Sequence, residues 1–217
     1  LGINEKFNGS GEDLYDLGIL FECLGFYAAP LSLTGCLVDV AQTLQKFSIS
    51  DKHQSIVSSI TQGEIYTSAI LEPLNQDPEN PITTAVFEDN KIIINGSKYL
   101  SEISSLAKGI LISASSNKGV ILALVNADDV QLTQLTSTAN SPLFKVELEN
   151  IVIENSDVIH QEGRGLEALR YLLQTNMVMR SYMALGVTQK MTSLVASYTS
   201  EREQFGRVIG TFQAVSH

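Results

Sequence analysis

The 217-residue sequence predicts an α+β fold with a helical N-terminal region, an antiparallel β-barrel in the middle and the start of a C-terminal helical bundle. Three observations predict this order. Apolar residues recur every three or four positions up to about residue 64, they alternate in short β-branched runs up to about residue 158, and the helical period then returns. The expected domains are therefore 1–64, 65–158 and 159–217, and both ends of the chain are expected to be cut.

The N-terminal region is expected to hold three helices. The first covers about 11–26, with Glu12 and Asp13 favouring its positive end, and a second apolar stretch covers 31–47. Ser50 is a candidate cap for a third helix at about 51–62, with Gly63 as its stop. The apolar face of the first helix consists of Leu14, Leu17, Phe21 and Leu24.

The middle region is expected to be a mostly antiparallel sheet that closes into a barrel, with a sandwich as the other possibility. Its candidate strands are YTSAILE, TTAVFED, KIIING, GILISAS, GVILALVN and LFKVELENIVIE. Three turn signals separate them, at Asp89-Asn90, Asn95-Gly96 and 117–119, because Asn and Gly tolerate the positive φ that hairpins need.

The C-terminal region is expected to be one long helix from the Gly-Arg-Gly at 163–165 to about Arg202. Gly186 would either let a neighbouring element approach this helix or kink it. Strands and helices are segregated and no GxGxxG occurs, which argues against a doubly wound nucleotide-binding sheet. The helix carries an apolar stripe of Val187, Met191, Leu194, Val195 and Tyr198.

Composition excludes several classes of function. A net charge of −10 opposes binding to nucleic acid. No run of apolar residues is long enough for a membrane span, and the first residues lack the basic and apolar regions of a secretory signal. The chain is expected to be soluble and cytoplasmic, or in the mitochondrial matrix of a eukaryote. The two cysteines, Cys23 and Cys36, are expected to be buried free thiols. The three histidines, His53, His160 and His217, are expected at surface or capping positions, so neither a metal site nor hydrolase chemistry is predicted.

The closing segment SEREQFGRVIGTFQAVSH resembles a signature of the acyl-CoA dehydrogenase family, in which a long helix ends in Arg-x-x-Phe-Gly followed by Phe-Gln. Two further segments are similar to the family. Glu22 and Gly25 match the end of an early helix, and Ala69, Glu72 and Pro73 followed by Asn95-Gly96-Ser97-Lys98 match the flavin-contacting strand and the turn after it. The resemblance covers essentially the whole chain.

The resemblance implies a flavoprotein of lipid metabolism that uses FAD to remove a proton and a hydride from neighbouring carbons of an acyl-CoA thioester, as in β-oxidation. It implies a dimer or tetramer of like or unlike subunits and an electron-transfer acceptor as a further partner. By position, Arg202, Phe205 and Gln213 would contact FAD bound mainly by a partner chain, since a guanidinium pairs well with a diphosphate. The positions that flank the flavin in the chain's own barrel would be Leu71, Glu72, Pro73, Leu100 and Glu102.

The sequence departs from the family at the flavin loop and at the base. Leu71 replaces the usual Thr, and the usual Gly-x-Gly-Ser becomes Leu-Asn-Gln-Asp at 74–77, whose acidic end would repel a diphosphate. The family's carboxylate base falls either beyond this chain or at Asn176, an amide that cannot act as a base. The weak candidate that remains is Glu167, on the same helix.

Two interpretations follow. In the first, the chain belongs to an acyl-CoA dehydrogenase whose base lies elsewhere, and the isolated chain is inactive. In the second, it is a non-catalytic structural or assembly subunit of a heteromeric acyl-CoA dehydrogenase with a degenerate flavin site. YAAPLSL and INGSKYLSEISSLAKGILISAS are more similar to the heteromeric branch that acts on bulky acyl groups.

Overall fold

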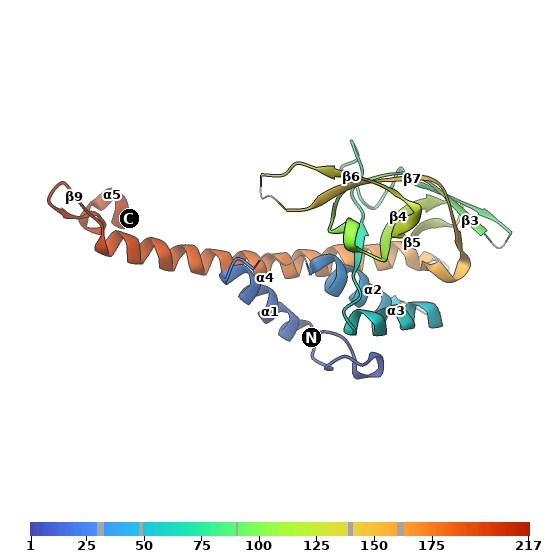
Figure 1. The fold of residues 1–217 in the computed structure, drawn as a ribbon, viewed down its shortest axis with the longest axis horizontal. Coiled ribbons are helices and arrows are strands. Elements are labelled where there is room, and N and C mark those ends of the chain that lie inside the picture. Colours follow the sequence, from blue (N-terminus) through green and yellow to red (C-terminus); the bar gives the residue numbers. More distant parts are fainter. Residues whose placement is uncertain (30–32, 48–49, 90, 139–140, 160–162) are drawn as a thin grey trace.

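The computed structural model describes residues 1–217 except 30–32, 48–49, 90, 139–140 and 160–162. Helices come first, strands follow and a long helix returns, so the predicted mixed α+β order is confirmed. Figure 1 shows the N-terminal helices α1 and α3 at the bottom, the sheet at the top, and helix α4 running between them and out to the C-terminus. The division into three domains near residues 64 and 158 stays a prediction.

The N-terminal helices begin and end at the predicted kinds of residue. Asp13 caps α1 (Leu14–Phe26) by accepting bonds from the amides of Tyr15 and Asp16. Ser50 caps α3 (Asp51–Thr61) by accepting from His53 N at 3.2 Å. Between them, a short wide-turned π-helix η2 (Thr34–Val40) leads directly into α2 (Ala41–Phe47), where the sequence predicted one continuous stretch.

The middle of the chain forms one eight-stranded, mostly antiparallel sheet in the order β6-β7-β3-β2-β4-β5-β8, with β1 paired to β4. β1 runs parallel to β4, and the hairpins β2–β3 and β4–β5 are antiparallel. Its strands are β1 (Tyr66–Ala69), β2 (Thr84–Glu88), β3 (Lys91–Glu102), β4 (Gly109–Ser116), β5 (Gly119–Asn126), β6 (Gln131–Leu135), β7 (Leu143–Glu154) and β8 (Val158–Ile159).

The predicted closed barrel is wrong, because the edge strands β6 and β8 do not pair with each other in the described part of the chain. The sheet also opens at its centre, where β2 and β4 share a single paired position, Thr84 with Ser115. The predicted turn at Asn95-Gly96 is wrong as well, since both residues lie inside β3 at an irregularity in its pairing with β7. Gly96 has φ 156°, and a Cβ there would lie 2.5 Å from Thr83 Oγ1.

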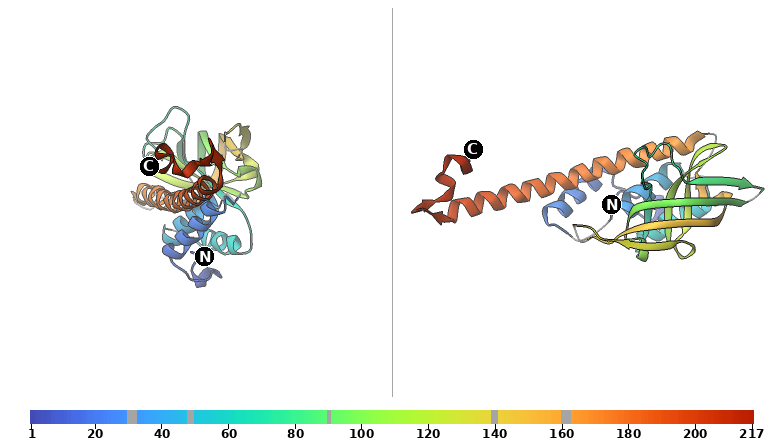
Figure 2. Two further views of the ribbon diagram at one scale, coloured as in Figure 1. Left: turned by 90° about the vertical axis from the view of Figure 1, so that its left-hand side faces the viewer. Right: turned by 90° about the horizontal axis from the view of Figure 1, so that it is seen from above.

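Helix α4 (Arg164–Glu201, 38 residues) connects the sheet to a C-terminal arm. The arm consists of the hairpin β9 (Glu203–Gln204) and β10 (Arg207–Val208), followed by helix α5 (Gln213–Ser216). Figure 2 shows this arm at the far end of α4, away from the sheet. The two-residue turn at Phe205-Gly206 has positive φ at both positions, as a tight hairpin requires.

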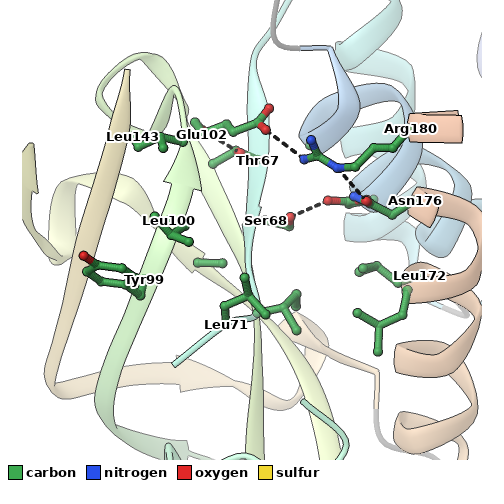
Figure 3. Close-up of a pocket in the computed structure, with 15 residues that line it drawn as sticks. Thr67, Ser68, Leu71, Tyr99, Leu100, Glu102, Leu143, Leu172, Asn176 and Arg180 are labelled. Atoms are coloured by element: carbon green, nitrogen blue, oxygen red, sulfur yellow. Dashed lines mark hydrogen bonds and ion pairs between the residues drawn. The ribbon is translucent and has the colours of Figure 1, made fainter. Parts of the chain in front are cut away.

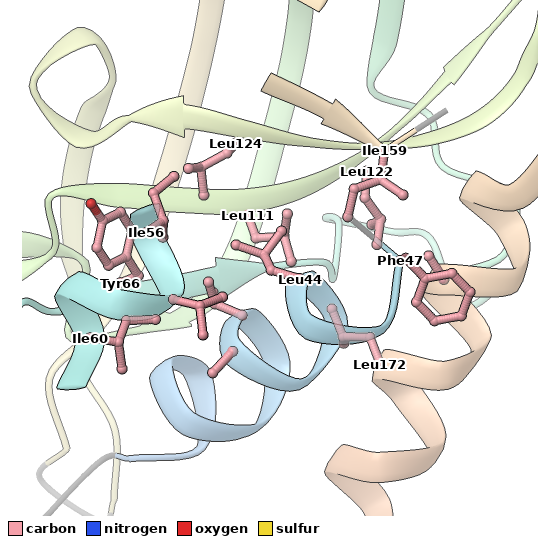
Figure 4. Close-up of a cluster of buried hydrophobic side chains, with 14 of the residues drawn as sticks. Leu44, Phe47, Ile56, Ile60, Tyr66, Leu111, Leu122, Leu124, Ile159 and Leu172 are labelled. Carbon is pink, nitrogen blue, oxygen red and sulfur yellow. The ribbon is translucent and has the colours of Figure 1, made fainter. Parts of the chain in front are cut away.

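Two packing layers hold the helices against the sheet. The larger core lies between α2, α3, α4 and one face of the sheet, as Figure 4 shows. α1 crosses α4 closely at Gly186, where an added Cβ would lie 1.9 Å from Glu22 O, so the predicted close approach is confirmed. The labelled core residues of Figure 4 include Leu44, Phe47, Ile56, Ile60, Leu111, Leu122, Leu124 and Leu172.

Three smaller predictions have mixed outcomes. Cys36 is buried as predicted, whereas Cys23 is exposed, because it lies on the outer face of α1. His53 is buried rather than at the surface, since the first turn of α3 packs against the segment that ends the sheet, while His217 is exposed and His160 lies outside the described residues. Among the helices that the structure describes, none has the length and apolar character needed to cross a bilayer.

Candidate functional site

A cavity of about 370 Å³ lies where β1, β3, η2 and α4 meet. Figure 3 shows the strands on one side and α4 on the other, with Glu102, Ser68, Asn176 and Arg180 toward one end and Leu71, Tyr99 and Leu172 toward the other. Residues 1–64 contribute η2 and the last part contributes α4, so the cavity is formed only when the three parts of the chain fold together. Its lining includes Asp39, Thr67, Ser68, Leu71, Tyr99, Leu100, Glu102, Leu143, Leu172, Leu173, Asn176 and Arg180.

The polar end of the cavity is a continuous chain of hydrogen bonds that joins four elements. Ser68 Oγ donates to Asp39 Oδ2 at 2.5 Å, and Asn176 Nδ2 donates to Asp39 Oδ1 at 2.7 Å. Arg180 Nε donates to Asn176 Oδ1 at 2.8 Å, and Arg180 Nη2 donates to Glu102 Oε1 at 2.8 Å. The chain fixes the orientation of the Asn176 amide, with its oxygen toward the guanidinium and its nitrogen toward the carboxylate.

Asp39 is the buried acid of this chain, with 4% of its surface exposed. Burial raises the pKa of Asp39 to about 6, and the bonds from Ser68 and Asn176 oppose that rise only in part. The residue lies near the end of the π-helix η2, and such wide turns are often found at functional sites because they turn a side chain away from the regular helical direction.

The apolar end of the cavity carries exposed hydrophobic side chains. Leu71 and Leu100 are 46% and 42% exposed, and Tyr99 lies beside them. Leu100 has φ 59°, which is unfavourable for a residue with a Cβ, and it lies in the second pairing irregularity between β3 and β7. Strained backbone of this kind is found at binding sites when the surrounding structure holds it in place.

Glu72 is in the same strand region but serves the interior of the sheet. Its Oε1 accepts from Lys98 Nζ at 2.8 Å and from Thr83 N at 2.8 Å, and its Oε2 accepts from Ile82 N at 2.6 Å and from Asn75 Nδ2 at 2.9 Å. Burial alone would raise the pKa of Glu72, but these bonds outweigh it and lower the pKa to about 2. The Glu72 carboxylate, which was predicted to flank the flavin, therefore already accepts hydrogen bonds from four donors within the protein.

The loop after Glu72 does not fit a diphosphate. A diphosphate site needs free backbone amides, and six amides of this loop are already bonded to oxygen atoms of Glu72, Asn75 or Asp77. Pro73 and Leu74 are exposed at its tip, and Asp77 adds negative charge, whereas Glu79 is paired with Arg170. The bonded amides are those of Asn75, Asp77, Glu79, Asn80, Ile82 and Thr83.

The residues of the arm fit a diphosphate and a ring better. Arg202, Phe205 and Gln213 are all exposed, and Phe205 is 93% exposed. The Phe205 and Phe212 rings meet edge to face at 6.3 Å, and the Arg207 guanidinium lies 4.0 Å from the centre of the Phe212 ring. The arm thus presents two guanidinium groups and an apolar ring to the solvent. It lies at the far end of α4, away from the sheet (Figures 1 and 2).

The structure gathers some of the predicted site residues and leaves others apart. Leu71, Leu100 and Glu102 line the cavity together with Asn176, whereas Glu167 is exposed and lies 3.6 Å from Arg164 in an ion pair. Sequence reasoning missed Asp39 and Arg180. A lone acid inside the apolar run GCLVDVAQ was the signal for Asp39, because an isolated charge in a buried stretch needs a polar partner.

Comparisons with known proteins agree with this fold. No protein-family model matches the chain. It is 24% identical over 97% of its length to "Probable acyl-CoA dehydrogenase YngJ" of Bacillus subtilis, covering 60% of that protein. The chain thus spans less than two thirds of the length of this relative.

Two solved structures have the same fold over essentially the whole chain. One is the "Tcur3481-Tcur3483 steroid ACAD G363A variant", at 27% identity and a TM-score of 0.89, with 100% of this chain and 58% of that chain covered. The other is the ChsE4-ChsE5 complex of Mycobacterium tuberculosis, at 24% identity and a TM-score of 0.90, covering 99% and 57%. Along its whole length the chain is thus similar in sequence to acyl-CoA dehydrogenases, and it shares the fold of these solved structures.

Proposed function

We propose that this chain acts as one subunit of an FAD-dependent acyl-CoA dehydrogenase assembly, which removes two hydrogens from neighbouring carbons of an acyl-CoA thioester. The observation that carries the proposal is the position of the arm. Arg202, Phe205 and Gln213 are exposed beyond the end of a 38-residue helix, which supports a contact with a cofactor held by another subunit.

Each residue of the arm would have its own part in such a site. When bound, the flavin supplies the acceptor for the hydride. Arg202 would neutralise the diphosphate by charge-assisted bonds, Gln213 would add a neutral hydrogen bond, and the Phe205 ring would cover an apolar face of the cofactor. The base that takes the proton is not assigned, because Asn176 is an amide and Glu167 is paired outside the cavity.

A second candidate function is a non-catalytic assembly subunit, and the loop at 73–83 favours it. The amides of that loop are bonded internally and Asp77 adds negative charge, which supports a chain that holds no flavin of its own. The two candidates share the arm and differ in whether the chain's own cavity takes part in dehydrogenation.

Visible absorbance of the purified protein tests both candidates. We expect the protein purified alone to be colourless or weakly yellow. After it is mixed with about one equivalent of an unlike acyl-CoA dehydrogenase subunit, we expect flavin absorbance to appear at about 450 nm. The Arg202→Met variant is expected to lower the flavin content of the assembly about tenfold or more, whereas Arg164→Met, on the same helix at its other end, is expected to leave it unchanged.

A flavin content unaffected by Arg202→Met would contradict the proposed arm contact. A fully flavin-loaded homo-oligomer that oxidises acyl-CoA would favour the catalytic candidate and exclude the assembly subunit.

A further inference from the structure

We propose that the cavity between β1, β3 and α4 binds a ligand with a protonated amine, which is held against the carboxylates of Asp39 and Glu102. The inference goes beyond the proposed function, because it concerns recognition by the chain's own cavity rather than the contact of the arm with a flavin. It rests on the charge of the cavity wall, on the bonding of Asp39 and on the leucines opposite.

The charge of the cavity wall favours a cation. Asp39 and Glu102 supply two negative charges and Arg180 supplies one positive charge, so the wall has an excess of one negative charge when both acids are ionised. Arg180 directs its Nη2 at Glu102 and its Nε at Asn176, and it is therefore committed to these two partners (Figure 3). Attraction of a cation is stronger here than in water because the low-polarity surroundings screen charge poorly.

Asp39 has no direct counterion among the residues that the structure describes. Its two partners, Ser68 and Asn176, are both neutral. A buried carboxylate without a counterion is costly, and an ammonium group within bonding distance would offset that cost. The two carboxylate oxygens of Asp39 accept one bond each, whereas a carboxylate can accept about four, so capacity remains for a ligand.

The apolar end of the cavity favours a hydrocarbon part of the ligand. Leu71, Leu100 and Leu172 line the same space of about 370 Å³ as the polar chain. A compact hydrocarbon skeleton would bury its apolar area against these leucines and place one ammonium at the polar end. A straight hydrocarbon without nitrogen would leave Asp39 uncompensated.

Calorimetric titration with two probes of nearly the same shape tests the inference on the protein at its full length. Piperidine-4-carboxamide carries a protonated ring nitrogen, and cyclohexanecarboxamide has a CH2 group in its place. At neutral pH we expect the amine probe to bind at least about tenfold more tightly, equal to about 1.4 kcal/mol. Equal affinity for the two probes, or no binding of either, would overturn the proposal.

Variants locate the effect. Asp39→Asn is expected to remove the preference for the amine, and Glu102→Gln to reduce it, while the exposed Asp128→Asn leaves it unchanged. Thermal melting of each variant checks that it is folded, and the Glu102→Gln result stands even if Asp39→Asn does not fold. A preference that survives both substitutions would also overturn the proposal. Because no readout involves flavin, failure here is distinct from failure of the proposed function.

The pH dependence supplies an independent check. The groups that face Asp39 are Ser68 on β1, Asn176 and Arg180 on α4, and Glu102 on β3. Since burial raises the pKa of Asp39 to about 6, its charge is lost as the pH falls through that value, whereas the piperidine stays protonated. Binding of the amine is therefore expected to weaken between about pH 7.5 and pH 5. Affinity that is constant over this range would contradict a role for Asp39.

Discussion

Two buried carboxylates of the molecule, those of Glu72 and Asp39, are bonded in opposite ways. Glu72 accepts four hydrogen bonds, one of them from the buried Lys98, while Asp39 accepts two, both from neutral groups. Glu72 is thereby a structural element that ties the loop at 73–83 to β3. Asp39 faces a cavity with bonding capacity left over. Saturation of hydrogen bonding, rather than burial alone, separates a structural acid from a candidate binding group.

The largest effect is expected from removing Lys98, the charged partner of Glu72, because this tests directly whether Glu72 is a structural acid. Lys98→Met leaves the Glu72 carboxylate buried without its cation, since the two side chains are 0% and 3% exposed. We expect the free energy of unfolding to fall by about 3–5 kcal/mol, measured by chemical denaturation. Lys145→Met, on the neighbouring strand β7 and partly exposed, is the control and should change stability little. A loss for Lys98→Met as small as that of the control would mean that the pair is not structural.

A smaller effect of opposite character is expected at Asp39. The pKa of Asp39 in the fold is about 6 against an ordinary 3.8, so the proton that it binds stabilises the fold. This contribution is complete below about pH 4 and is lost as the pH rises through about 6. The Asn side chain of Asp39→Asn does not titrate and makes no such contribution. The free energy of unfolding of the wild type, relative to that of Asp39→Asn, should therefore fall by roughly 2–3 kcal/mol from pH 4 to pH 7.5.

The measurement for Asp39 is a set of denaturation curves for both proteins across that pH range. Glu72, whose pKa is lowered to about 2, contributes in the other direction: its stabilisation is present above about pH 4.5 and is lost as the pH falls toward 2. A difference between wild type and Asp39→Asn that does not vary with pH would show that Asp39 is already neutral or already paired.

The smallest effect is expected at the ion pair that closes the polar chain. Arg180 and Glu102 have side chains 51% and 21% exposed, so Arg180→Met should cost less than about 1 kcal/mol of stability. The matched control is Arg170→Met, which removes another partly exposed ion pair, with Glu79, from the same helix. A much larger loss for Arg180→Met in thermal or chemical denaturation would show that the polar chain around Asp39 is structural, like the cluster around Glu72.

Local patterns predicted the fold well where they act alone. Asp13 and Ser50 cap the predicted helices, and Gly186 lies at a close helix crossing, because each is decided by neighbours in sequence or by one short contact. Strand β6 was missed because Gln131, Thr133 and Gln134 make it polar on an edge of the sheet. The barrel was wrong because closure depends on edge strands that meet only in three dimensions.

The candidate site was predicted in part. Resemblance grouped Leu71, Leu100 and Glu102 around one ligand, and all three line the same cavity, while their contact with a flavin stays a prediction. It could not reveal that Glu102 pairs with Arg180, or that Asn176 bonds to Asp39, because these contacts join parts of the chain that are far apart in sequence. The cytoplasmic or mitochondrial location, the identity of the acyl group and the electron-transfer partner stay predictions.

Helix α4 carries Asn176 and Arg180 of the cavity in its first half and the arm beyond its end, without a break. Its 38 residues span about 57 Å at 1.5 Å each. One rigid rod thus acts as a ruler that sets the spacing between the chain's own cavity and whatever its arm touches. Each residue inserted between Arg180 and Arg202 would rotate the arm by about 100° around the helix axis and move it about 1.5 Å along that axis. The length of this segment therefore determines the position of the arm as much as the side chains do.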